Sequence, residues 1–289
     1  MPAAQFRLGR LLLWMAGVLL SFSALAVSVR ELTRVLSVVE ILALRNAAGI
    51  AILVMLALAR PQLRPDLLPR RMRLHALRNV IPFAAQVGWA LGVKLLPLAM
   101  VFSLEFTSPA WVALLAVVLL GERLTPSRLG AVLLGFAGVL LIMRPGLAGF
   151  QPASLLVLAA AIGFAVVAIA TKTLTRTEST FAILFWMNVI QLPLNLTASD
   201  PLFALKLDTS HLLPVIGVAV SGLSAHYCLT NAFRCGDATI VVPLDFLRIP
   251  LIALTGWALY GEALDGFVFA GAGLIVIGLV WNLRAEARR

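Results

Sequence analysis

Residues 96–146 read LPLAMVFSLEFTSPAWVALLAVVLLGERLTPSRLGAVLLGFAGVLLIMRPG and return in looser form over residues 243–283. A shift of about 140 residues aligns the whole chain with itself. The shift pairs Lys94 with Arg234, Glu105 and Phe106 with Asp245 and Phe246, Gly121 and Glu122 with Gly261 and Glu262, and Gly138 with Gly278. The chain therefore consists of two copies of one repeat, which we place at residues 1–146 and 147–289.

Composition indicates a membrane protein, because 61% of the residues are hydrophobic, 12% are charged and the mean hydropathy is +1.01. Apolar segments fall at residues 11–29, 36–59, 76–95, 97–120, 127–143, 153–173, 179–197, 211–233, 237–260 and 265–283. They predict an all-α polytopic membrane protein with ten transmembrane helices. Each copy holds five spans, an odd number, so the second copy is inverted relative to the first, as in many secondary transporters.

The net charge of +10 comes from Lys and Arg that gather on alternate loops, sixteen on one side and five on the other, with Arg45 and Arg248 inside spans. This pattern predicts cytoplasmic termini and lipid contact rather than nucleic-acid binding. The first residues imitate a cleavable signal peptide. We expect them to stay as the first span, since removal would leave four spans in one copy against five in the other.

The sequence shows no pattern typical of an enzyme. Cys228 and Cys235 are expected to be small buried residues, and the three histidines are scattered. No serine sits in a nucleophile-elbow pattern. We therefore expect no catalytic residue, no metal site and no cofactor.

Charged residues inside the apolar segments are the candidates for substrate binding, because a charge in lipid is costly. They are Glu40, Arg45, Glu105, Asp245 and Arg248. Glu105 and Asp245 each lie eight residues into their spans, about 12 Å deep at ~1.5 Å per residue. This predicts one central site lined by the fourth and ninth spans. The alternative is that Asp245 and Arg248, spaced i, i+3, neutralise each other.

Polar and aromatic residues at a similar depth extend the predicted site: Gln86, Trp89, Trp111, His226 and Asn231. The tryptophans are suited to stacking on a ring or a cation, or to simple packing. His226 is either a proton relay or a satisfied intramembrane histidine. Asn188, Gln191 and Asn195 on the seventh span predict hydrogen bonds between helices.

Prolines and glycines predict where the helices bend and where they touch. Pro109, Pro243 and Pro250 flank the buried acids and are candidate hinges, or tolerated kinks. The glycines of the fifth and tenth spans predict close helix contacts, in a scaffold or at a homodimer interface. They are Gly135, Gly138, Gly271, Gly273 and Gly278.

The chain resembles the EamA family of the drug/metabolite transporter superfamily. The resemblance rests on Gly121-Glu122 at the end of the fourth span and on the glycine-rich fifth span that ends in Arg144-Pro145-Gly146. Gly261-Glu262 repeats the first feature, whereas the second copy has no Arg-Pro-Gly ending. Arg45 is similar to an arginine often found in the second span of the family. The resemblance implies ten helices in two inverted repeats around a central cavity.

The resemblance also implies secondary transport of a small molecule at a bacterial inner membrane, without identifying the substrate. We expect export of an amino acid or an amino-acid-derived zwitterion, up to an opine-type metallophore. Glu105 and Asp245 would hold the amino group, and Arg248 and Arg45 the carboxylate. The alternatives are import of riboflavin, S-adenosylmethionine or a choline-like cation and, in another class, a non-transporting membrane partner or a flippase subunit.

Overall fold

The computed structural model describes residues 8–96, 98–144, 151–262 and 264–287, and every regular element within these ranges is helical. The first half contains α1 Leu8–Leu32, α2 Val38–Ala59, η1 Pro61–Leu67, α3 Met72–Leu95, α4 Leu98–Glu105, α5 Ser108–Leu115, η2 Ala116–Leu120 and α6 Pro126–Met143. The second half contains α7 Ala153–Leu174, α8 Thr180–Leu196, η3 Phe203–Lys206, η4 Thr209–His211, α9 Leu212–Cys235, α10 Ala238–Leu244, η5 Asp245–Leu247, α11 Arg248–Tyr260 and α12 Gly266–Ala287. The predicted boundary between the copies, at 146/147, and the side chain of Lys94 lie outside the described residues.

Eight stretches in the described part of the chain are long and apolar enough to cross a membrane. Two of them join short elements: α4, α5 and η2 form one stretch, and α10, η5 and α11 form another. The other two predicted spans correspond to α3, with 24 residues, and to α8, a shorter apolar helix of 17 residues. All ten predicted segments thus lie on helices, and eight of them qualify as spans by length and composition.

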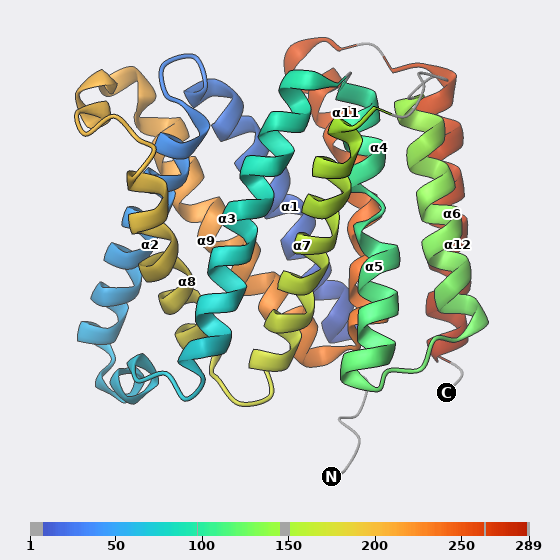
Figure 1. The fold of residues 1–289 in the computed structure, drawn as a ribbon, viewed down its shortest axis with the longest axis horizontal. Helices are drawn as coiled ribbons and strands as arrows, with labels where there is room; N and C mark the ends of the chain where they lie inside the picture. Colours follow the sequence, from blue (N-terminus) through green and yellow to red (C-terminus); the bar gives the residue numbers. More distant parts are fainter. Residues whose placement is uncertain (1–7, 97, 145–150, 263, 288–289) are drawn as a thin grey trace. The chain divides into compact units, whose positions relative to one another are not determined.

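The chain divides into two compact units that differ from its sequence halves. Unit 1 comprises residues 1–11, 84–169 and 235–289, and unit 2 comprises residues 12–83 and 170–234. Each unit therefore combines segments from both copies of the repeat (Figure 1).

The longest helix contact in unit 1 runs between α6 and α12, which lie side by side (Figure 1). Glycines permit the close approach: a Cβ on Gly138 would lie 2.5 Å from the carbonyl oxygen of Gly271, and one on Gly278 would lie 2.9 Å from Cβ of Leu134. Gly135 makes room for the ring of Phe246 in the same way. This packing agrees with the scaffold alternative for these glycines. Gly273 does not, since a Cβ there would meet no atom within 4 Å.

Arginine–carboxylate pairs hold both ends of the α6–α12 pair. At one end Arg128 Nε donates to Glu286 Oε1 at 2.8 Å. At the other end Arg144 pairs with Asp265 and lies over the ring of Phe267, 4.5 Å from its centroid. The backbone N–H of Val268 and the Arg144 guanidinium hold the pKa of Asp265 below its usual value. The clamps and the glycine contact together make α6 and α12 a closely packed pair within unit 1.

We expect Gly138→Ala to lower the stability of the purified protein by about 1–3 kcal/mol, because the new methyl group meets a backbone oxygen that cannot move aside. Gly273→Ala is the matched control, since the same methyl group enters open space on α12. Thermal unfolding in detergent measures both. Equal midpoints for the two variants would contradict the close α6–α12 contact.

Candidate substrate-binding site

The fourth predicted span is broken where its acid lies. Helix α4 ends at Glu105, and α5 begins at Ser108 with Pro109 in its first turn. Proline is favoured there because the N–H groups of a first turn have no acceptor within the helix, so a residue without an N–H loses no hydrogen bond. Thr107 Oγ1 donates to the carbonyl oxygen of Leu104 at 2.6 Å. This bond gives a partner to a carbonyl group in the last turn of α4. Pro109 therefore fixes the site of the break.

The ninth predicted span is broken at the equivalent place. Helix α10 ends at Leu244, Asp245 opens the short 3₁₀ turn η5, and α11 starts at Arg248. Pro243 lies just before the turn and Pro250 just after it. Both acids paired by the internal repeat thus sit at helix breaks, where backbone groups are less tied to a regular helix.

Glu105 is held by an aromatic neighbour within unit 1. Trp89 Nε1 donates to Glu105 Oε2 at 2.8 Å, and the ring of Phe102 meets Trp89 edge-on with centroids 6.0 Å apart. Trp111 is half-buried, and its Nε1 has no acceptor among the described residues. Gln86 is half-buried on α3 in the same unit. An acid bonded to one indole is suited to bind a flat or cationic group.

Asp245 and Arg248 pair with each other, as the alternative to the zwitterion site predicts. Arg248 Nη2 donates to Asp245 Oδ2 at 2.5 Å, while Oδ1 of Asp245 is buried with no partner in the described part of the chain. The rings of Phe106 and Phe246 stack in the same unit, 6.1 Å between centroids. In this conformation the pair presents little net charge to a ligand.

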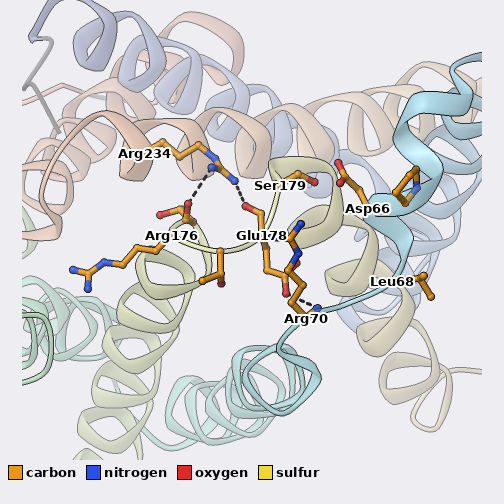
Figure 2. Close-up of a pocket in the computed structure, with 10 residues that line it drawn as sticks. Asp66, Leu68, Arg70, Arg176, Glu178, Ser179 and Arg234 are labelled. Atoms are coloured by element: carbon orange, nitrogen blue, oxygen red, sulfur yellow. Dashed lines mark hydrogen bonds between the residues drawn. The ribbon is translucent and has the colours of Figure 1, made fainter. Parts of the chain in front are cut away.

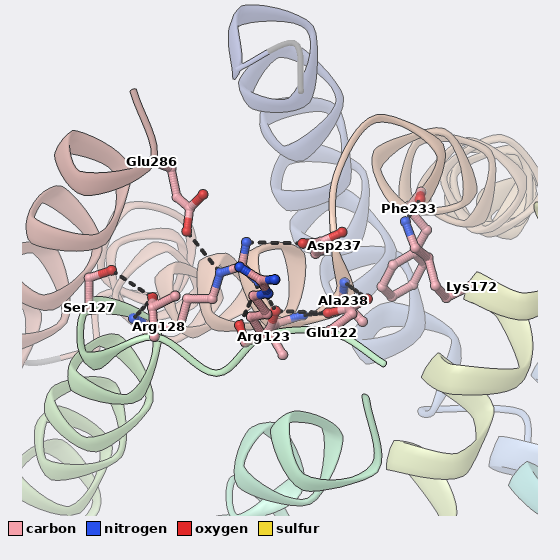
Figure 3. A network of polar contacts seen from close by, with 11 residues as sticks. Glu122, Arg123, Ser127, Arg128, Lys172, Phe233, Asp237, Ala238 and Glu286 are labelled. Atoms are coloured by element: carbon pink, nitrogen blue, oxygen red, sulfur yellow. Dashed lines mark hydrogen bonds and ion pairs between the residues drawn. The ribbon is translucent and has the colours of Figure 1, made fainter. Parts of the chain in front are cut away.

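A polar network secures the start of α10 (Figure 3). Gly121 ends η2 in the left-handed conformation at φ 69°, so the chain turns and brings Glu122 to α10. The Glu122 carboxylate accepts from the backbone N–H of Ala238 at 2.8 Å and of Thr239 at 2.9 Å. It thereby caps a helix whose own N-cap residue makes no side-chain cap bond. The network positions the span that carries Asp245.

Arg128 completes this network. Its guanidinium donates to Asp237 Oδ2 at 3.0 Å, to Thr239 Oγ1 at 2.8 Å and to the carbonyl oxygen of Arg123 at 2.9 Å, besides the bond to Glu286. This buried charge is therefore paired with two carboxylates and makes four hydrogen bonds to groups of the described residues.

The other predicted site residues lie in unit 2. Arg45 Nη2 donates to Gln191 Oε1 at 3.2 Å. The imidazole of His226 meets the ring of Phe22 edge-on at 5.9 Å. Asn231 bonds to protein groups: its Nδ2 donates to the carbonyl oxygen of Tyr227, and its Oδ1 accepts from a threonine hydroxyl. Asn231 thus serves helix packing in this conformation.

Glu40 and the amides of α8 have local roles. Glu40 forms a capping box with Ser37 at the start of α2 and pairs with Lys206 at 3.0 Å, so its charge lies at a helix end. Asn188 and Asn195 donate to carbonyl oxygens of their own helix. Gln191 bonds to another helix, where its Nε2 donates to Asn79 Oδ1 at 3.2 Å, and the Asn188 side chain packs against Gly49 of α2.

Arg78 is one of the sixteen basic residues that the charge pattern assigns to loops on one side of the membrane. In the structure it lies within α3 and is 3% exposed, and Arg128, counted in the same group, lies in α6 and is 5% exposed. Its Nε donates to Thr171 Oγ1 at 2.8 Å and its Nη1 to Asn79 Oδ1 at 2.9 Å. The apolar segment predicted at residues 76–95 already included Arg78, so the hydropathy pattern placed this residue inside a span.

Unit 2 also contains a cavity of about 360 Å³ between the loop before α3 and the loop between α7 and α8 (Figure 2). Its lining includes Arg70, Arg176 and Arg234, but none of the predicted site residues. The Arg234 guanidinium donates to the carbonyl oxygens of Thr175 and Glu178, and the Glu178 carboxylate accepts from the backbone N–H of Arg70. These bonds join the two loops, so Arg234 and Glu178 stabilise the fold around the cavity.

The sequence profile of the EamA-like transporter family matches residues 9–144 and matches again over residues 151–284. The chain belongs to the EamA-like transporter family. It is a membrane transporter of the drug/metabolite transporter type, and the EamA profile covers nearly all of it.

Relatives of this EamA-like chain are named for different substrates, and they include both an S-adenosylmethionine uptake transporter and an exporter. It is 32% identical to a riboflavin transporter of Rhizobium johnstonii over 219 residues, 74% of this chain and 71% of that protein. It is 27% identical to the pseudopaline exporter CntI of Pseudomonas aeruginosa over 274 residues, 92% of this chain and 95% of that protein. A solved crystal structure superposes with a TM-score of 0.78 at 21% identity, covering 96% of this chain and 97% of that one, and shows the fold.

We expect Trp89→Phe to destabilise this EamA-like protein by about 1–3 kcal/mol, because it removes the hydrogen bond to the half-buried Glu105 carboxylate. Trp111→Phe is the matched control, since its N–H has no acceptor to lose among the described residues. Thermal unfolding of Trp89→Phe, Glu105→Gln and the double variant gives the coupling between the two residues, expected at about 0.5–3 kcal/mol. A coupling of zero would show that the bond contributes nothing.

Proposed function

We propose that this EamA-like transporter imports riboflavin or a closely related heteroaromatic metabolite by secondary transport. The observation that carries the proposal is the mutual pairing of Asp245 and Arg248. Because these two charges offset each other, the groups of unit 1 suited to a ligand are Glu105 with its Trp89 partner and the stacked phenylalanine rings. Riboflavin is uncharged at neutral pH, has a flat three-ring system and carries hydroxyl groups. The likeness to the riboflavin transporter supports the same substrate class.

Trp89 and Glu105 are the residues that we assign to recognition. The indole offers a face for the flavin ring, and the carboxylate accepts a hydrogen bond from a ring N–H or a hydroxyl group of the side chain. Because Glu105 ends α4 beside a helix break, a small rotation of α5 about residues 105–108 would move one wall of the site. Pro109, Pro243 and Pro250 are the hinges in this proposal.

The proposed topology has ten spans in two inverted repeats, with α3 and α8 as the two spans beyond the eight. The 24 residues of α3 reach about 36 Å as a helix, enough for a hydrocarbon core of about 30 Å. The excess of Arg and Lys on alternate loops supports cytoplasmic termini at a bacterial inner membrane. Both matched relatives are bacterial proteins, which supports the same location.

The test of substrate is uptake of labelled riboflavin into proteoliposomes, together with growth of a bacterial riboflavin auxotroph that lacks its own uptake system. We expect saturable uptake and rescue of growth. Trp89→Ala is expected to weaken the apparent affinity about 10-fold, equivalent to about 1.4 kcal/mol of lost stacking. Trp257→Ala is the matched control, because Trp257 is 56% exposed on α11. No uptake by the wild-type protein, under conditions in which it is folded, would contradict the proposal.

Export of an amino-acid-derived zwitterion is the second candidate. The observation that favours it is the match to the pseudopaline exporter, which spans nearly the full length of both chains. In this case Glu105 would hold the amino group of the solute. Inside-out vesicles distinguish the two functions: they accumulate amino acids or opine-type conjugates if the protein is an exporter, and Glu105→Gln abolishes that accumulation.

A further inference from the structure

Unit 2 buries two arginines that have no acid beside them. Arg78 on α3 is 3% exposed and Arg45 on α2 is half-buried. No carboxylate of the described residues lies within 4.0 Å of either guanidinium. The carboxylates that lie in ion pairs in unit 2 are paired with other residues: Glu31 with Arg34, Glu40 and Asp200 with Lys206, Glu178 with His75, and Asp208 with His211.

The partners of the two arginines are neutral groups. A chain of amides links them: Arg45 donates to Gln191, Gln191 donates to Asn79 Oδ1, and Arg78 donates to the same oxygen. Among the described residues, Arg78 also donates to the Thr171 hydroxyl. This network orients both cations toward a common region without neutralising either of them.

Each guanidinium retains donors for a further acceptor. A guanidinium has five N–H donors. Arg45 Nε is buried and has no acceptor in the described part of the chain, and Arg45 uses Nη2 alone for its hydrogen bonds to side chains. The stem of Arg45 lies against α9, where a Cβ on Gly222 would come within 2.6 Å of its Cδ. The glycine holds the arginine in place beside α9.

Arg128 in unit 1 shows how the same chain treats a buried arginine that needs no ligand. It is 5% exposed and bonds to two carboxylates, Asp237 and Glu286. Burying a cation without an anion is unfavourable by several kcal/mol. Two arginines in the protein interior with no carboxylate beside them therefore need another source of stabilisation. The contrast indicates that the partner of Arg45 and Arg78 comes from outside the chain.

We infer that Arg45 and Arg78 form a binding site in unit 2 for one small anionic group, either a carboxylate of a transported solute or a free inorganic anion. Guanidinium groups bind carboxylate, phosphate and halide through charge-assisted hydrogen bonds. Gln191 and Asn79 are positioning residues that hold the two cations in register. The site goes beyond the proposed function, because riboflavin has no anionic group to place there.

The experiment is an anion titration of the purified full-length protein in detergent, in a buffer whose only anion is a bulky sulfonate. Chloride, phosphate, acetate and glycine are added separately, and the midpoint of thermal unfolding is measured. A ligand that binds the folded state alone raises the midpoint in a saturable way. We expect at least one of these four additions to do so, and we expect Arg45→Gln and Arg78→Gln to lose the response. Arg78→Lys, which keeps the charge, is expected to retain a weaker one.

Arg128→Gln is the matched control: it should unfold at a lower temperature than the wild-type protein, because Glu286 loses its partner, and should keep the anion response in full. A response to chloride or phosphate identifies an inorganic anion, and a response to acetate or glycine alone identifies a solute carboxylate. No response to any of the four, or a full response in both glutamine variants, overturns the inference. Riboflavin uptake is measured separately, so its failure leaves the anion titration unaffected.

Discussion

Backbone hydrogen bonding in a hydrocarbon environment is the constraint on which the rest of this protein depends. In lipid, each N–H and C=O needs a partner within the protein, so a transmembrane helix is broken only where other protein groups cover the break. This chain breaks two spans, after Glu105 and at Asp245, and both breaks lie in unit 1. At the start of α10, the Glu122 carboxylate accepts hydrogen bonds from the first two N–H groups of the helix. A residue from another loop thus supplies the N-terminal cap that α10 does not have from its own N-cap residue.

The same unit supplies rigidity beside the breaks. Helices α6 and α12 approach closely through glycines and are clamped at both ends by arginine–carboxylate pairs. A continuous, tightly packed pair next to two interrupted spans fits the proposed mechanism, in which the interrupted spans move and the packed pair keeps its shape. The family membership and this division of roles are consistent with each other.

Arginines play opposite parts in the two units. Arg128 bonds to two carboxylates, whereas Arg45 and Arg78 bond to amide and hydroxyl groups of the described residues. The sequence alone does not distinguish these three arginines, because each lies within an apolar segment. Their partners come from distant parts of the chain, as with Arg78 and Thr171, so local sequence patterns do not reveal which of the three arginines is paired with acids.

The sequence by itself determined the helical segments, the internal repeat, the family and the positions of the helix breaks, because hydropathy, Pro109, Pro243 and the Gly-Glu pairs act locally along the chain. It also singled out Glu105, Asp245 and Arg248 as buried charges. Only the tertiary structure decided which charges are paired: Trp89 binds Glu105, Asp245 and Arg248 neutralise each other, and Arg45 meets Gln191 instead of an acid. The reason is that pairing depends on side chains brought together by helix packing, which the order of residues along the chain does not reveal.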